Sequence, residues 1–455
     1  MKNLKIILLI CSFLYFCSCK KYLDQPPNPT LAIPNSTSDL QALLDSYNSM
    51  NFKFPTTMVM LSDDYYLLPT DLNSVTNATY RGRYTWEADD SQFSDWIAIY
   101  LGPIKTANAV LDNLSNVPKT ASNEKDLDGI KGSALFYRGF YFQACAQLFA
   151  QPYKPATAAS DLGIALRLDG DFNKVSKRST VADTYQQVIN DLQTAVTLLP
   201  EKQILKTRPT KAAAYGALSR TYLSMQDYAN AGKYADLCIQ AYGPDSLIDY
   251  NSLNAGAAAP FKQFNKEVIF HAIGQTNTLI ANSRAKIDSN LYRSFGTNDL
   301  RKKLFFKANS NNTYQFKGDY NGSGTSSGYA FGGIVLDEMY LNRAEAYARN
   351  NQISLAMADL NKLMKNRWLV GLFTPFLASD QQSALTLILN ERRKELIFRG
   401  TRWTDLRRLK DDPIFSITPV RKLNNQIVKL DPLSPRYTLL IPSTVINLSG
   451  MQQNP

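Results

Sequence analysis

Three short segments of this sequence combine aromatic rings with acidic, amide and guanidinium side chains, outside any apolar helical stripe. Aromatic faces pack against apolar C–H faces, whereas carboxylate, amide and guanidinium groups hydrogen-bond hydroxyls. A ligand that offers both kinds of surface, such as a sugar, fits these segments. The predicted contact residues are Asp63, Asp64, Tyr65, Tyr66, Arg81, Arg83, Trp86, Asn290, Tyr292, Arg293, Phe295 and Asn298. The stacking rings are expected among the five aromatic members, unless these are ordinary loop aromatics packed on a scaffold.

Catalytic chemistry has few candidates in this sequence. His271 is the only histidine, so several imidazoles cannot hold zinc and a histidine base could act only there. Because it adjoins an apolar run, we expect His271 to be structural. The acid pairs Asp63/Asp64 and Asp89/Asp90 are sequence neighbours, whose side chains usually point apart, so they make poor pairs for glycoside hydrolysis. We expect no catalytic residue, metal or cofactor.

The N-terminus predicts a bacterial lipoprotein signal. Lys2 and Lys5 precede an apolar run that is too short to span a bilayer and that ends in small residues and Cys19. A thiol at this position receives diacylglycerol before cleavage, so we expect residues 1–18 to be removed and Cys19 to carry the lipid. The alternative is an ordinary secretory signal with incidental cysteines. A lipidated protein would be tethered to the membrane and not inserted in it.

Helical periodicity predicts the elements that must position the polar segments. Apolar residues recur at helical spacing from about Ser38, over residues 94–114 and 127–149, and from Thr180, a predicted N-cap, to Leu199. Two later cysteines, Cys145 and Cys238, lie on apolar helical faces. We expect them to be buried free thiols in preference to a disulfide.

One helix–turn–helix pattern occurs twice. Residues 210–242 carry an aromatic, a small residue, an aromatic and a second small residue at tetratricopeptide spacing, and residues 340–356 repeat the same offsets. The first set is Tyr215, Ser219, Tyr222 and Ala231, and the second is Tyr340, Ala344, Tyr347 and Ala356. Small residues allow paired helices to approach closely, so the repeat favours a helical-repeat scaffold. Arg343 and Glu345 in the second unit are expected to form ion pairs inside the scaffold.

The remaining segments differ in character. Residues 243–333 are rich in Asn, Gly and Ser with little helical period, apart from a short strand expected at 268–273. Residues 318–333 are Gly-rich but lack the Gly-Lys-Ser/Thr ending of a phosphate-binding loop. Long ordered loops on a rigid scaffold more often carry function, which favours a binding role for this insertion. Residues 383–409 predict one long helix, and the charges of residues 391–410 suggest a solvated face or structural ion pairs.

Several motifs, in their order along the chain, resemble the SusD/RagB family of outer-membrane nutrient-binding lipoproteins. They are Cys19 with Tyr22-Leu23-Asp24, WIAIYLGPIKTAN at 96–108, LFYRGFYF at 135–142, DEMYLNRAEAYAR at 337–349, ERRKELIFRGTRWTDLRRL at 391–409, and the closing Gln453-Asn454-Pro455. The resemblance implies a mainly α fold, in which a tetratricopeptide-like scaffold carries an irregular, loop-rich ligand-binding region. It also implies a SusC-like TonB-dependent transporter as partner, a glycan or sometimes a peptide as ligand, and no catalysis.

These observations together predict a signal peptide at 1–18, a lipidated tether at 19–37 and one SusD-like domain over 38–455, with the irregular insertion at about 243–333. The expected function is capture of oligosaccharides at the outer face of the outer membrane and their delivery to the transporter. A peptide receptor, a carboxylate-dependent glycoside hydrolase and an assembly scaffold without a small ligand stay open as alternatives. The net charge of +11 could suit nucleic acid or an acidic glycan, but an exported lipoprotein seldom meets nucleic acid.

Overall fold

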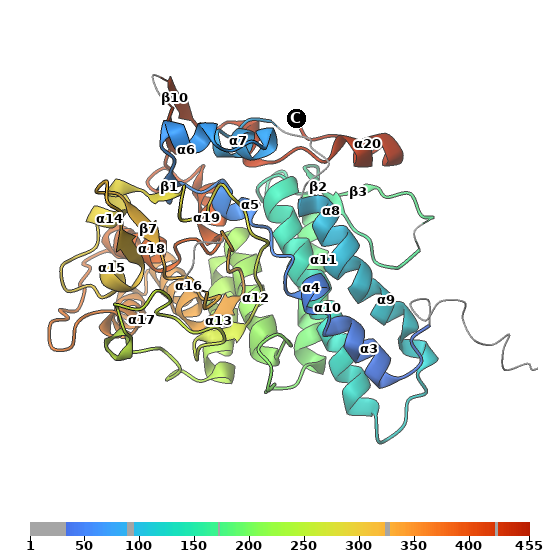
Figure 1. Cartoon of the computed structure of the whole chain (residues 1–455). Helices are drawn as coiled ribbons and strands as arrows, with labels where there is room; N and C mark the ends of the chain where they lie inside the picture. Colours follow the sequence, from blue (N-terminus) through green and yellow to red (C-terminus); the bar gives the residue numbers. More distant parts are fainter. Residues whose placement is uncertain (1–32, 89–94, 172, 324–327, 424–425) are drawn as a thin grey trace, which may run out of the picture.

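Paired helices form the body of the molecule. Figure 1 shows the computed structural model, which describes residues 33–88, 95–171, 173–323, 328–423 and 426–455. The successive pairs are α10 (Glu124–Phe149) with α11 (Val181–Leu198), α12 (Lys211–Ser224) with α13 (Tyr228–Tyr242), and α16 (Leu336–Arg349) with α17 (Ile353–Lys365). Each pair packs against the next, so the predicted mainly α helical-repeat scaffold is confirmed.

Polar side chains begin several of these helices where the sequence predicted a start. The Thr180 hydroxyl accepts a hydrogen bond of 3.0 Å from the Asp183 amide at the head of α11. Thr210 and Asp227 make equivalent contacts at the heads of α12 and α13. Such caps satisfy amide groups that have no partner within the helix, and each stabilises by about 1 kcal/mol.

The helix expected over residues 94–114 is divided. It consists of α8 (Asp95–Ile99), the π-helical η2 (Tyr100–Ile104) and α9 (Lys105–Asn113), which pack on α10 beside α3 (Thr37–Leu44). Pro103 lies inside η2. Proline donates no backbone hydrogen bond and crowds the preceding turn, which accounts for the wider turn at this point.

Short elements make up the rest of the chain. The strands form antiparallel pairs, namely β1 (Tyr65–Tyr66) with β5 (Lys286–Ile287), β2 (Leu162–Ala165) with β3 (Arg178–Thr180), β4 (Val268–Phe270) with β8 (Ile334–Val335), β6 (Phe306–Ala308) with β7 (Tyr314–Phe316), and β9 (Val420–Leu423) with β10 (Gln426–Lys429). The strand expected at 268–273 is therefore present as β4. The short helices are α4 (Tyr47–Met50), α5 (Thr57–Met60), α6 (Pro69–Asn73), α7 (Ala78–Tyr84), η3 (Leu114–Asn116), η4 (Tyr250–Ser252), α14 (Ser289–Arg293), α15 (Arg301–Leu304), η5 (Pro435–Tyr437) and α20 (Ser443–Ser449).

Two apolar clusters form the core. The larger lies between the paired helices and includes Phe136, Phe140 and Phe270, whose rings contact one another at centroid distances of 4.7–5.7 Å. The second lies within the insertion and the loops beside it. Cys145 and Cys238 are buried free thiols, as predicted. Among the described residues, no helix is long and apolar enough to cross a membrane.

The predicted long C-terminal helix is wrong, because the chain reverses inside it. Helix α18 (Gln381–Glu395) and α19 (Thr401–Leu409) are separate elements. Between them Phe398 and Gly400 have φ values of +60° and +76°. These left-handed conformations cannot continue a right-handed helix. The break lets the two helices face one another, and Arg392 of α18 donates to Asp405 of α19 at 2.8 Å.

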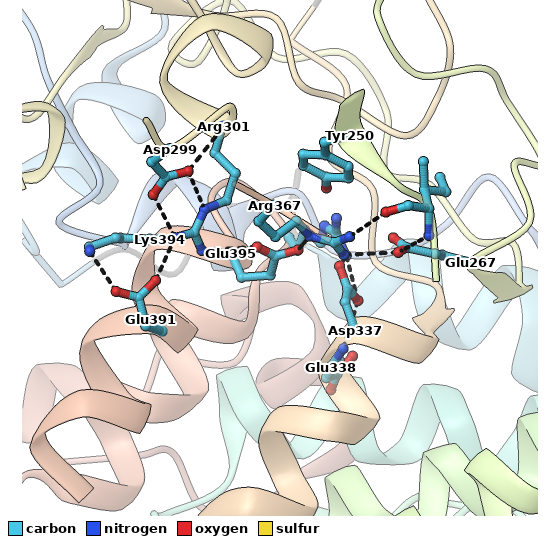
Figure 2. A network of polar contacts seen from close by, with 12 residues as sticks. Tyr250, Glu267, Asp299, Arg301, Asp337, Glu338, Arg367, Glu391, Lys394 and Glu395 are labelled. Carbon is cyan, nitrogen blue, oxygen red and sulfur yellow. Dashed lines mark hydrogen bonds and ion pairs between the residues drawn. The ribbon is translucent and has the colours of Figure 1, made fainter. Parts of the chain in front are cut away.

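The charges of residues 391–410 are not a solvated face. Figure 2 shows a buried network in which Arg301 contacts Glu391 and Glu395 of α18 at 2.5 and 3.0 Å. Arg367 continues the network to Glu395 at 2.6 Å and to Glu267 at 2.9 Å. Each of these guanidinium groups is fully buried and has carboxylate partners, which is what makes a buried charge tolerable. The network holds the insertion on the scaffold.

Arg343 and Glu345 of the second repeat unit form ion pairs inside the scaffold, as expected. Arg343 donates to Asp359 at 2.6 and 2.7 Å, and Glu345 accepts two hydrogen bonds of 2.7 Å from Arg408. Both pairs join neighbouring helices, so these charges are part of the scaffold.

Candidate functional site

The strand pair β1–β5 brings two of the predicted polar segments together. Tyr65 lies opposite Ile287 and Tyr66 opposite Lys286, while the Asp288 amide donates to the Asp64 carbonyl at 2.8 Å. Residues 63–66 and 286–298 are distant in sequence but become neighbours through these bonds. In Figure 1 they lie near β1 and α14, at one side of the molecule.

The second predicted segment borders a cleft of about 310 Å³. The cleft lies between α5, α7, the start of α8 and residues 275–277 of the insertion. Its polar lining includes Lys53, Tyr80, Arg83, Asp95, Gln275 and Asn277, and Met60 and Ile97 add apolar surface. One cleft thus offers an ammonium group, a guanidinium group, a carboxylate, amides and a tyrosine ring.

Internal bonds fix the floor and wall of the cleft. Arg83 Nη1 donates to the Thr57 hydroxyl at 2.7 Å and lies 4.0 Å from Asp95 Oδ2. Burial raises the pKa of the Asp95 carboxyl, and the Arg83 charge opposes that rise. The Thr56 hydroxyl donates to the Gln275 carbonyl at 2.8 Å, which ties the insertion to the start of α5. These contacts organise hydrogen-bonding groups along the cleft.

Three of the five predicted stacking rings are core residues, so for them the alternative of aromatics packed on the scaffold holds and the stacking role is wrong. Tyr65 and Trp86 are 1% exposed and Phe295 is 2% exposed. The Tyr65 hydroxyl donates to the Met60 carbonyl at 2.9 Å, and Trp86 Nε1 donates to the Leu61 carbonyl at 3.0 Å. The polar atoms of both rings are therefore buried and already hydrogen-bonded, and neither needs to face solvent for a partner.

The other two rings keep some exposure, and their role stays a prediction. Tyr66 is half-buried on β1. Tyr292 is half-buried and stacks on Tyr314, with ring centroids 3.5 Å apart and planes at 16°. Burial and the neighbouring Tyr314 raise the pKa of Tyr292 to about 12. A ring stacked in this way offers at most its second face to a ligand.

The polar members of the second and third segments have mostly local partners. Arg81 donates to the Val75 carbonyl at 2.5 Å and to the Thr76 carbonyl at 3.1 Å. Arg293 donates to the Asn290 carboxamide at 2.6 Å, and both side chains are exposed. Asn298 is half-buried, and its carbonyl accepts from the Leu369 amide at 2.9 Å. Asn290 and Arg293 are therefore the accessible members of the third segment.

The acid pair Asp63/Asp64 is structural in its contacts. The Asp63 carboxylate accepts hydrogen bonds from Arg402 at 2.6 and 2.9 Å and lies 3.1 Å from Arg393. Burial would raise the pKa of Asp63, but the two guanidinium charges hold it below the usual range. Burial raises the pKa of Asp64 to about 6, although Arg393 opposes the rise. Neither side chain lines the cleft. The second pair, Asp89/Asp90, lies outside the described residues, as does Cys19.

Comparison with known proteins agrees with the motifs in the sequence. Residues 21–223 match a family described as "Starch-binding associating with outer membrane", and residues 274–429 match the SusD family. Across 100% of both chains, this protein is 24% identical to the SusD-like protein P2 of Formosa agariphila. The chain belongs to the SusD/RagB family.

Solved structures share the fold of this SusD/RagB-family chain at low sequence identity. A putative sugar-binding protein from Bacteroides vulgatus is 21% identical with a TM-score of 0.74, over 93% of this chain and 99% of that one. A SusD superfamily protein from Bacteroides thetaiotaomicron is 22% identical with a TM-score of 0.75, over 92% and 100%. Surface glycan-binding protein A from Bacteroides uniformis is 16% identical with a TM-score of 0.68, over 92% and 99%.

Several cleft residues of this SusD/RagB-family chain were missed by the sequence analysis. Tyr80 directly precedes the predicted Arg81, yet within residues 80–86 only Tyr80 and Arg83 line the cleft. Gln275 and Asn277 belong to a polar run, residues 275–278, inside the insertion. That run was a usable signal, because it follows the predicted strand and carries amide side chains. Nothing in the local sequence indicated Lys53, because its loop is positioned by hydrogen bonds to residues distant in sequence, such as the one from the Phe54 amide to the Ile273 carbonyl.

Proposed function

We propose that this protein captures oligosaccharides at the cell surface, with the cleft beside Tyr80 and Arg83 as the binding site. The single observation that carries the proposal is the lining of that cleft. Guanidinium, ammonium, carboxylate and amide groups converge beside a tyrosine ring and apolar side chains. A sugar needs this combination, because its hydroxyls require charged or amide partners and its ring face requires an apolar surface. The family description and the relatives named as sugar- or glycan-binding support the same ligand class.

The proposed action is binding without turnover. Hydrolysis of a glycosidic bond needs two carboxyl groups that flank the bond, one of them able to donate a proton. Among the described residues, Asp95 is the one carboxyl that lines the cleft, and it lies 4.0 Å from Arg83. The rival pair Asp63/Asp64 is engaged by Arg402 and Arg393 away from the cleft. A carboxylate-dependent hydrolase is therefore the weaker alternative.

The proposal also covers location and partner. Cys19 would carry the lipid at the start of a tether over residues 19–37, and the protein would deliver its ligand to a SusC-like TonB-dependent transporter at the outer face of the outer membrane. Membership of the SusD/RagB family and the predicted signal support this assignment. Membrane fractionation of a Cys19→Ala variant in cells that lack the transporter tests the anchor, since the variant should become soluble. A variant that stayed fully membrane-bound would contradict the anchor assignment.

A polysaccharide panel tests the proposed function. Purified mature protein, with Cys19→Ala to remove the anchor, is run in affinity electrophoresis against starch, laminarin, xylan, mannan, pectin and alginate. A mixed peptide digest is tested by calorimetry alongside. Retardation by at least one polysaccharide, without release of products, is the expected result. Binding to peptides alone would favour a peptide receptor, product formation would favour a hydrolase, and binding to neither would favour an assembly scaffold.

A further inference from the structure

The loop between α17 and α18 exposes several large apolar side chains. Residues 368–379, which we call the apolar loop, read WLVGLFTPFLAS and contain no charged residue. The exposed fractions of Leu369, Val370, Leu372 and Leu377 are 41%, 79%, 49% and 86%. Single apolar residues on a surface need no explanation, but a cluster of this kind marks an interaction site. The apolar loop is separate from the cleft, because none of its residues lines the cleft.

The backbone of the apolar loop is fixed at both ends. Arg367, which directly precedes it, is fully buried in the ion-pair network of Figure 2, and its carbonyl accepts from the Leu300 amide at 2.9 Å. Near the other end, the Phe376 amide donates to the Asn361 carboxamide oxygen at 2.8 Å, and the Asn361 carboxamide nitrogen donates back to the Phe376 carbonyl at 3.0 Å. The exposed aliphatic side chains therefore project from a rigid base, and their exposure is not the result of a loose segment.

Three aromatic rings lie at the base of the apolar loop. The Trp368 ring centroid lies 5.9 Å from that of Phe373 and 6.4 Å from that of Phe376, and the two phenylalanine centroids are 6.0 Å apart. All three rings are half-buried and pack against the core of the scaffold. The loop thus has aromatic rings against the protein body and more exposed aliphatic side chains around them. Aromatic rings favour the boundary between water and hydrocarbon, and aliphatic side chains favour the hydrocarbon itself.

Basic side chains flank the apolar loop. Residues 361–379 contain two lysines and one arginine and no acidic residue. Lys365 is exposed, and so is Lys303 of α15, the helix that the Leu300 bond joins to the base of the loop. Lys362 lies 3.9 Å from Asp245, which offsets part of the positive charge. The net balance around the loop is positive, so a surface that carries negative charge complements it.

We propose that the apolar loop inserts into the surface of a membrane that carries anionic lipid headgroups. The inference rests on the proposed function through its lipid anchor, and it adds a second contact between the protein and the same membrane. The aliphatic side chains would meet hydrocarbon, the aromatic rings the interface, and the lysines the headgroups. A protein tethered to a bilayer meets it at a high effective concentration, so a weak contact is sufficient to hold one orientation of the scaffold.

Vesicle binding tests the proposal, and the protein carries its own reporter. Of its four tryptophans, Trp86, Trp96 and Trp403 are at most 3% exposed, whereas Trp368 is half-buried in the apolar loop. Mature protein with Cys19→Ala is mixed with vesicles of equal amounts of phosphatidylcholine and phosphatidylglycerol, and flotation measures the bound fraction. In parallel vesicles, brominated acyl chains quench a tryptophan that reaches them. We expect this protein to float with the vesicles and its Trp368 fluorescence to be quenched.

Two matched double variants of the same protein locate the contact. Val370→Ser/Leu377→Ser changes the two most exposed apolar side chains of the loop, and Ile204→Ser/Leu433→Ser changes two that are 97% and 86% exposed elsewhere on the chain. The loop variant should bind the vesicles about ten-fold more weakly, and the control should bind them normally. Because all four side chains are exposed, both variants should keep the parent melting temperature. Vesicles of phosphatidylcholine alone should bind the parent protein more weakly, because they lack the charge that the lysines complement.

The outcomes separate this inference from the proposed function. If the parent protein does not float with the vesicles, or if the loop variant floats equally well, the inference is wrong. Self-association that the loop variant loses would also overturn it, because a second copy of the chain would then cover the loop. The assay uses protein without the lipid, so its result depends neither on the anchor nor on glycan binding. The loop alone binds reversibly, so Cys19→Ala protein should still be released from cell membranes during fractionation, and the two failures are distinguishable.

Discussion

Arg402 of α19 donates two hydrogen bonds to the carboxylate of Asp63, at 2.6 and 2.9 Å, across most of the length of the chain. Arg393 of α18 contacts the same carboxylate at 3.1 Å. Asp63 therefore ties the loop that begins β1 to both helices of the C-terminal motif. Burial would raise the pKa of this carboxyl, but the two guanidinium groups lower it below its usual range.

Removing that carboxylate charge should destabilise the fold. Asp63→Asn leaves Arg402 and Arg393 with one uncharged partner, and breaking a buried pair typically costs about 3–5 kcal/mol. Because these side chains keep 13–25% of their surface, we expect the lower end, about 3 kcal/mol. Urea denaturation measures the change. The control Asp45→Asn breaks a more exposed pair with Arg208 and should cost less than about 1 kcal/mol. Equal losses in the two variants would contradict a buried role for Asp63.

Replacing the adjacent acid should have the opposite effect. Burial raises the pKa of Asp64 from 3.8 to about 6, so above that pH the folded protein carries a carboxylate charge that burial destabilises. As pH falls from about 6 to about 4, the folded protein takes up the proton first and gains stability relative to the unfolded chain. Asp64→Asn should therefore be more stable than wild type at pH 7.5, by about 2 kcal/mol, and equal to it near pH 4. A variant that is less stable at pH 7.5 would refute this account.

His271 should make the fold sensitive to acid. Burial lowers its pKa from 6.5 to about 4, so the folded protein resists the proton that the unfolded chain accepts. Its stability contribution is complete above about pH 6.5 and is lost as pH falls towards 4, a change of about 3 kcal/mol. The free energy of unfolding of His271→Gln should not show this decline, and the difference between variant and wild type isolates it from the Asp64 effect. Parallel pH profiles would rule out this role for the imidazole.

A glycine beside the cleft should tolerate no side chain. Gly328 has φ +73°, and a Cβ there would lie 2.1 Å from the Asn277 carbonyl oxygen. Gly328→Ala must displace Asn277, so it should lower stability and weaken ligand binding together. Gly371 has φ +77° with nothing within 4 Å of the added atom, so Gly371→Ala tests strain alone at about 1–2 kcal/mol. Thermal melts and calorimetry compare the two, and normal binding by Gly328→Ala would show that Asn277 is not a contact.

The scaffold could be predicted from sequence because its signals are local. Thr180 caps α11 and the small residues of the repeats recur at fixed offsets, so period and capping suffice for the paired helices. The division of the C-terminal motif could not be predicted, since Phe398 adopts a left-handed conformation that nothing in its neighbourhood indicates. Its pairing with Tyr65, at 5.7 Å, arises only once the fold is complete.

The candidate site was predictable only in outline, for the same reason. Arg421 lies over Tyr65, Tyr84 and Trp86 at 4.3–4.9 Å from their ring centroids, and it is far from all of them in sequence. Two of these rings, Tyr65 and Trp86, were predicted contact residues. The composition of their loops does not reveal that a guanidinium distant in sequence covers them in the fold. By contrast, Arg83, a predicted contact residue in a short polar segment that ends a helix, does line a cleft, and its contact with a ligand stays a prediction.

The most direct test of the central claim is calorimetric titration of Tyr80→Ala and Asn277→Ala with the polysaccharide that binds the wild-type protein, with Leu448→Ala as an exposed control. A lost stacking ring or hydrogen bond of about 1–3 kcal/mol should weaken binding about five- to a hundred-fold, while thermal melts stay close to wild type. The account predicts this loss for both cleft variants and none for the control. Wild-type affinity in both cleft variants would contradict the assignment of the cleft as the glycan-binding site.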